Sequence, residues 1–121
     1  MEKTDDLSIG DQYDFEMGLV KQAQWVKDMS HDKWMQFLLI SLPSEAAEVL
    51  DEFKKPMDGR REFNRTDTLK ELSDVLWSVS LIAQELGSSL DEITVIGMKK
   101  MRARYPERTS IPNRYLEEGI K

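Results

Sequence analysis

Two pairs of acidic residues are the strongest candidates for chemistry in this sequence. Glu45 and Glu48 form one pair and Glu71 and Asp74 the other, and within each pair the carboxylates are three residues apart. Both pairs lie in segments with helical periodicity, where positions i and i+3 are neighbours on one face. If the two helices face each other, four negative groups gather, and a cation is needed to keep them ionised. Carboxylate oxygens are hard ligands that suit Mg²⁺, Mn²⁺ or Ca²⁺.

A solvated acidic helix face is the competing interpretation of each pair. For a single pair it is the more common outcome, because charged residues are mostly exposed. Two pairs on consecutive helices are less common, and here each pair borders an apolar stripe. Because burying an unpaired charge is costly, the pattern favours a cation site.

Other metal and nucleophile chemistries are disfavoured by composition. The chain has no cysteine and one histidine, His31. Zinc sites use histidine or cysteine, and di-iron bundles use a Glu-x-x-His motif twice. There is no Ser–His or Cys–His arrangement for acyl chemistry and no glycine-rich phosphate motif. We therefore expect His31 to be structural or exposed, and Trp25, Trp34 and Trp77 to lie in a core or an interface.

Length and charge indicate one domain and argue against two classes of partner. The 121 residues, spanning positions 1–121, fit a single domain, with a polar lead-in over 1–10 and an extended tail over 106–121. A net charge of −6 argues against a nucleic acid polymer as partner. No apolar run is long enough to cross a membrane, and the acidic N-terminus does not resemble a secretory signal. We expect a cytoplasmic protein with no membrane partner.

Helical periodicity dominates and strand signals are few, so the expected class is all-α, a four- to five-helix bundle. Helices are predicted over about 11–28, 32–55, 66–87 and 90–104. Asp32 is predicted to cap the second helix, and Pro43 to kink or restart it. Gly87 is a natural stop for the third helix, and Ser89 opens the fourth with a capping box.

Two further segments leave alternatives open. The loop over 57–65 is basic, with Arg60, Arg61 and Arg65, and it is either solvated surface or a phosphate-facing loop. Residues 75–83 are apolar on almost every side. A helix of that kind is buried on every side. Because so short a chain cannot cover it alone, we expect the core to be completed by oligomerisation.

Together these motifs resemble the MazG-like family of all-α nucleoside triphosphate pyrophosphohydrolases. The run ELSDVLW from Glu71 to Trp77 is close to that family's usual ELGDVLW, and 38–55 is similar to its metal-binding helix, which often ends in paired lysines. Residues 86–90 and 100–106 match its helix connection and its KLxxRYP ending, so the resemblance covers roughly 13–106. Two positions depart from it: Gly97 replaces an asparagine normally near the substrate, and Pro43 interrupts a helix that is commonly continuous.

The resemblance implies Mg²⁺-dependent hydrolysis of (deoxy)nucleoside triphosphates between the α and β phosphates, with Mn²⁺ as a substitute ion. It implies four metal ligands: Glu45, Glu48, Glu71 and Asp74. Glu48 is also the candidate for orienting or deprotonating water. The candidate phosphate contacts, each of which is alternatively an exposed solvating charge, are Lys54, Lys55, Lys100 and Arg104. Family members assemble as dimers or tetramers, so we expect a homodimer or homotetramer.

Two other functions remain open at this point. One is a related pyrophosphatase acting on a phosphoribosyl-nucleotide-like substrate. The other is a non-catalytic helical interaction module, whose carboxylates would only solvate a dimer. The sequence leaves base and sugar preference undetermined.

Overall fold

The computed structural model describes residues 6–106, and every regular element in that range is a helix, which confirms the all-α class. The elements are α1 (Ile9–Gly18), the 3₁₀ helix η2 (Leu19–Gln22), α2 (Gln24–Lys27), α3 (His31–Met57), α4 (Arg65–Glu85) and α5 (Leu90–Arg104). The predicted tail lies outside the described residues apart from Pro106, and so do the first five residues of the lead-in.

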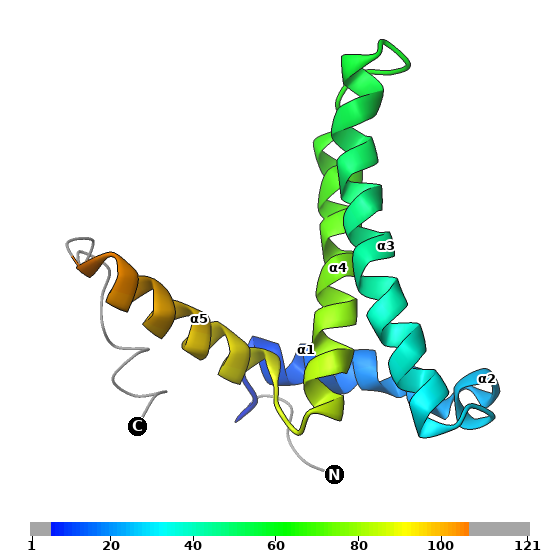
Figure 1. The fold of residues 1–121 in the computed structure, drawn as a ribbon, viewed down its shortest axis with the longest axis vertical. Coiled ribbons are helices and arrows are strands. Elements are labelled where there is room, and N and C mark those ends of the chain that lie inside the picture. Colours follow the sequence, from blue (N-terminus) through cyan, green and yellow to red (C-terminus); the bar gives the residue numbers. More distant parts are fainter. Residues whose placement is uncertain (1–5, 107–121) are drawn as a thin grey trace.

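The long helices α3 and α4 lie side by side, α1 crosses near one end of the pair, and α5 leaves from that same end in another direction (Figure 1). We call residues 43–76, the distal parts of α3 and α4 with their connecting loop, the arm. Residues 9–42 and 77–89 are the base. None of the helices in 6–106 is long and apolar enough to span a membrane.

The prediction of one helix over 11–28 is wrong. After α1 the chain tightens into η2, and Ala23 is extended, with ψ 140°, before the short α2. This break brings Val26 into the core, at 8% exposure, and places the Trp25 ring 5.4 Å from that of Phe37. Tertiary packing of these side chains therefore outweighs local helix propensity.

The start and the course of α3 also differ from expectation. Ser30, not Asp32, is the N-cap, because its Oγ accepts the backbone N–H of Lys33 at 3.2 Å. The helix does not restart at Pro43 and does not end at Pro56; both prolines lie inside it. The carbonyl freed by Pro43 belongs to Leu39, which is exposed and can be hydrated.

The boundaries of the last two helices follow the sequence closely. Asn64 caps α4 by accepting from Asp67 N at 2.9 Å. Gly87 adopts φ 72° just after α4, a conformation that glycine tolerates and that ends a helix. Ser89 caps α5, accepting from Glu92 N at 3.1 Å as the capping box predicts.

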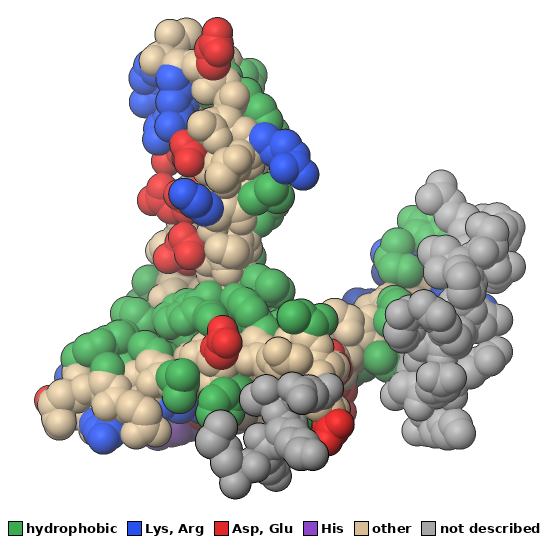
Figure 2. Space-filling view, turned by 180° about the vertical axis from the view of Figure 1, so that it is seen from behind, with side chains coloured by type: hydrophobic (Ala, Val, Ile, Leu, Met, Phe, Trp, Pro, Cys, Tyr) green, Lys and Arg blue, Asp and Glu red, His purple; other side chains and the backbone are tan. Residues whose placement is uncertain are grey.

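The hydrophobic core lies in the base. Leu38 and Leu81 are fully buried there, together with Val26 and Trp34. The arm has no such core, and its large apolar side chains are exposed; they include Leu50, Phe53, Met57, Leu69, Leu72 and Leu76. The stretch predicted to be buried all round is therefore covered only in part within one chain. Figure 2 shows a broad hydrophobic area where the arm meets the base.

Two carboxylates, the buried Asp14 and the partly buried Glu85, hold the helices of the base together. Glu85 accepts a hydrogen bond from Trp34 Nε1 at 2.7 Å and pairs with Lys21 at 3.1 Å. Asp14 accepts hydrogen bonds from Ser80 Oγ at 2.7 Å and from the backbone N–H of Leu90 at 3.0 Å. These contacts join α1, α3, α4 and the start of α5, so the lower end of the helix pair is held by both apolar and polar packing.

Candidate metal centre

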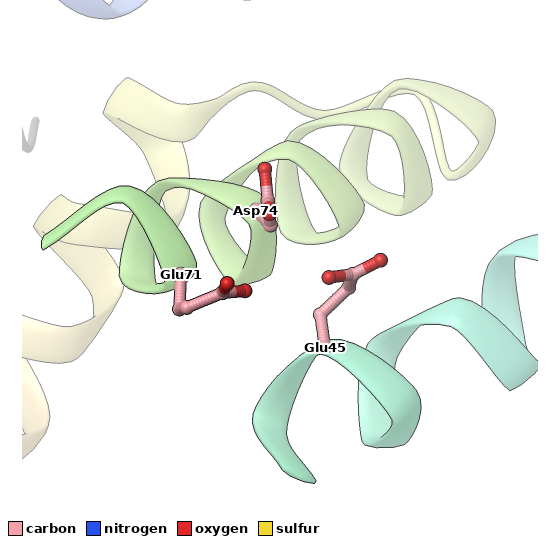
Figure 3. Close-up of side chains that lie close together, drawn as sticks. All are labelled: Glu45, Glu71 and Asp74. Carbon is pink, nitrogen blue, oxygen red and sulfur yellow. The ribbon is translucent and has the colours of Figure 1, made fainter. Parts of the chain in front are cut away.

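Three of the predicted ligands come together across the helix pair. Glu45 belongs to α3, whereas Glu71 and Asp74 belong to α4, and one carboxylate oxygen of each lies within 4.8 Å of the other two. Figure 3 shows Glu45 reaching from its helix toward the helix that carries Glu71 and Asp74. The i, i+3 spacing on α4 puts both of its carboxylates on the face that meets α3.

Glu48 lies next to this group, outside the three that converge. Its side chain is exposed, and its charge raises the pKa of both Glu45 and Glu71. Glu48 is thus on the same side of α3 as Glu45. It is close enough to act on the centre electrostatically and open enough to meet solvent water.

The centre carries uncompensated negative charge. Burial raises the pKa of Glu45, and the nearby charges of Asp74 and Glu48 raise it further. Burial is also the main cause of the raised pKa of Glu71, followed by Asp74 and Glu48. In residues 6–106, no ion pair involves Glu45, Glu71 or Asp74. A set of hard oxygen donors without a protein cation fits Mg²⁺ or Mn²⁺.

Tyr13 borders the centre and was not predicted from sequence. Its hydroxyl donates to the backbone carbonyl of Ser73 at 3.3 Å, which places it beside Asp74. Burial, then the charge of Asp74, then that of Asp14, raises the pKa of the Tyr13 hydroxyl. Tyr13 comes from α1, far from the acidic motifs in sequence, and no spacing rule could connect it to them.

A second group that sequence reasoning missed extends the centre toward the tip of the arm. Glu52 is buried and pairs with Arg61, which also lies 3.6 Å from Asp67. The signal was present as helical spacing, because Glu52 follows Glu48 by four residues and Asp67 precedes Glu71 by four.

The four predicted phosphate contacts divide between two places. Lys54 and Lys55 lie in the last turn of α3, at the arm end that carries the acidic pairs. Figure 2 shows lysine and arginine side chains beside the acidic ones on the arm. Lys100 and Arg104 lie in the C-terminal half of α5, which projects away from the arm within one chain (Figure 1).

The remaining candidate positions lie away from the acidic centre. His31 is exposed and 3.5 Å from Glu85 at the base, as predicted for a structural or exposed histidine. Trp34 is buried in the core and Trp77 packs against it. Gly97, on α5, has open space where a Cβ would sit, so packing within one chain does not require glycine there.

The fold and this centre define an all-helical protein with facing carboxylates between two long antiparallel helices. The family model for the MazG nucleotide pyrophosphohydrolase domain matches residues 34–109. The chain belongs to this family, whose members hydrolyse phosphorus anhydrides of nucleotides. No curated protein and no solved structure matches the chain.

Proposed function

We propose that this chain is a Mg²⁺-dependent pyrophosphohydrolase of (deoxy)nucleoside triphosphates, which yields a nucleoside monophosphate and pyrophosphate. The observation that carries the proposal is the convergence of Glu45, Glu71 and Asp74, with which no lysine or arginine of residues 6–106 forms an ion pair, in a chain of the MazG family. A triphosphate is itself strongly negative, so it approaches four carboxylates only with divalent cations between them.

In the proposed mechanism Glu45, Glu71 and Asp74, which converge in the structure, hold the cation, with Glu48 as the fourth proposed ligand. The chemistry that Mg²⁺ supplies when bound is polarisation of a phosphoryl oxygen and a lower pKa for coordinated water. Glu48, exposed beside the three ligands, accepts the proton of the attacking water. Water oxygen bonds to phosphorus, the bridging P–O bond breaks, pyrophosphate leaves with the bridging oxygen, and the proton passes to solvent.

The basic residues of the arm are proposed to contact the phosphates. Lys54 and Lys55 follow the acidic pair on the same helix, about two turns beyond Glu48. A cation aimed at a phosphoryl oxygen stabilises the charge that develops in the transition state. The same role is proposed for Lys100 and Arg104, which within one chain are carried on the projecting α5.

We further propose that the chain works as a homodimer or homotetramer. The support is the exposed apolar surface of the arm and of α5, where Ile93, Ile96 and Met101 are at least partly open. Large exposed apolar patches on a soluble protein commonly mark protein–protein interaction sites. Light scattering coupled to gel filtration gives the assembly size, and Leu76→Lys is expected to reduce it; a monomeric wild type contradicts this part.

The test is a pyrophosphate-release assay with each common ribo- and deoxyribonucleoside triphosphate, with Mg²⁺ or with a chelator. Activity is expected to disappear with the chelator and in Asp74→Ala. It is expected to persist in Asp32→Ala, the control, which also removes a carboxylate but at the start of α3. A phosphoribosyl nucleotide in the same panel distinguishes the related pyrophosphatase. Silence on every substrate, with no effect of Mg²⁺ on the melting temperature, indicates the interaction module.

A further inference from the structure

Six carboxylates follow the facing sides of α3 and α4 in the arm. On α3 the intervals from one to the next are three and four residues, and on α4 the same intervals occur in the opposite chain direction. Because the helices are antiparallel, the six fall into three facing pairs, which we call the carboxylate ladder: Glu45 with Asp74, Glu48 with Glu71, and Glu52 with Asp67.

The contacts of the described residues support this register. Glu45 lies against Asp74 and Glu71 in the converging group. Glu52 and Asp67 share one partner, Arg61. The third pair also belongs to the same electrostatic group as the others, because the charge of Glu52 reaches Glu71.

The third pair differs from the first two in having its own cation. Nη2 of Arg61 donates to Oε2 of Glu52, and Nη1 lies 3.6 Å from Oδ2 of Asp67. The Glu52 side chain is only 7% exposed. A carboxylate so buried is stable only when paired and hydrogen-bonded, and a planar guanidinium can serve two carboxylates at once.

We propose that Arg61 is a positioning residue that acts as the built-in cation of the third pair and confines divalent cations to the first two pairs. With Arg61 in place, Glu52 and Asp67 do not serve as metal ligands. The inference rests on the proposed function, because that function makes the first two pairs the cation site. The ion pairs of Arg61 with the third pair do not depend on it.

The neighbouring residue gives the contrast that isolates this role. Arg60 pairs with Asp58 at 2.7 Å, two residues away in the same exposed turn. None of the ion pairs within residues 6–106 joins Arg60 to a carboxylate of the ladder. Of the two adjacent arginines of the basic loop, Arg61 alone joins the loop to the ladder, so a change at Arg60 is a matched control.

The experiment counts Mn²⁺ ions bound to the purified full chain by electron paramagnetic resonance titration, in the absence of nucleotide. Arg61→Gln is expected to bind about one additional ion per chain, because Glu52 and Asp67 are then free to act as oxygen ligands. Arg60→Gln is expected to keep the wild-type number. The double variant Glu52→Gln with Arg61→Gln is expected to return to that number.

Each outcome decides the inference. An unchanged ion count in folded Arg61→Gln overturns it. Should that variant fail to fold, as circular dichroism would show, Glu52→Gln decides: the wild-type count supports the inference, and a lower count overturns it by making Glu52 a ligand. An extra ion in Arg61→Gln with none in the wild type supports the inference while the proposed function fails.

Discussion

The base and the arm of this molecule are stabilised in opposite ways. In the base, the partly buried carboxylate of Glu85 accepts a hydrogen bond from Trp34 and pairs with Lys21. In the arm, Glu45, Glu71 and Asp74 face one another, and within the part of the chain that the structure describes none of them has an ion-pair partner. The first arrangement stabilises the fold as built, whereas the second is the site that we propose is completed by a divalent cation. Stability and function are thus separated along the same two helices.

The largest expected effect tests this separation with the same chemical change in each region. Glu71→Gln is expected to lower kcat/KM by about 100-fold or more, since metal ligation supplies several kcal/mol of transition-state stabilisation and about 1.4 kcal/mol corresponds to tenfold in rate. Glu85→Gln is expected to retain activity and to lose stability. Pyrophosphate release and thermal melting measure the two; equal losses of activity would remove the distinction between base and arm.

The second test addresses the core of the base. Leu38 is fully buried, and Leu38→Ala is expected to cost about 2–5 kcal/mol of unfolding free energy because it leaves a cavity. Its neighbour Leu39 is 56% exposed, and Leu39→Ala is expected to cost less than about 1 kcal/mol. Urea unfolding at one protein concentration gives both values. A similar cost at the two positions would mean that Leu39, although exposed in one chain, is buried in the assembly.

The third test uses the pH dependence of the unfolding free energy that Glu85 contributes. Burial raises the pKa of Glu85, but hydrogen bonds from Lys21 and Trp34, together with the charges of Lys21 and His31, outweigh burial, and the pKa is lowered. The contribution of Glu85 is therefore present above its ordinary pKa and is lost as pH falls through the lower folded value. Glu85→Gln is expected to cost about 1–2 kcal/mol at neutral pH and less at acid pH. A difference between the two proteins that does not shrink on acidification contradicts the assignment.

The smallest expected effect concerns the arm, where stability changes with pH in the opposite direction to that expected for Glu85. The pKa values of Glu45 and Glu71 are raised, so the folded chain binds more protons than the unfolded one between the ordinary and the raised values. Without Mg²⁺, these two groups make stability rise as pH falls through that window. Compared with the double variant Glu45→Gln with Glu71→Gln, the wild type is expected to gain about 1–3 °C in melting temperature. Excess Mg²⁺ should remove the difference.

The acidic centre was more predictable than the elements around it. The i, i+3 spacing of Glu71 and Asp74 already requires one helix face, and the structure brings both to Glu45. Arg61 could not be assigned in the same way. Its partner Glu52 is adjacent only after the loop folds back on α3, and nothing local in the basic loop distinguishes Arg61 from Arg60.

Helix ends were likewise predictable where they depend on local contacts and unpredictable where they depend on distant residues. Ser89 and Gly87 act through contacts within a few residues, and both were predicted correctly. The break at Ala23 depends on Val26 and Trp25 reaching a core built from distant residues. Pro43 was predicted to kink or restart α3, and the helix does not restart there: an exposed proline is tolerated inside a helix whose other turns are held by packing.

Because α3 continues through Pro43, a movement of its core end is transmitted to its carboxylates. Leu38 in the core and Glu52 in the ladder belong to one helix, and at 1.5 Å per residue they are about 21 Å apart along its axis. A tilt of about 5° at the core end would displace Glu52 by about 2 Å, comparable to the length of a metal–oxygen bond. Substitutions deep in the base can therefore change the spacing of the carboxylates without touching any of them.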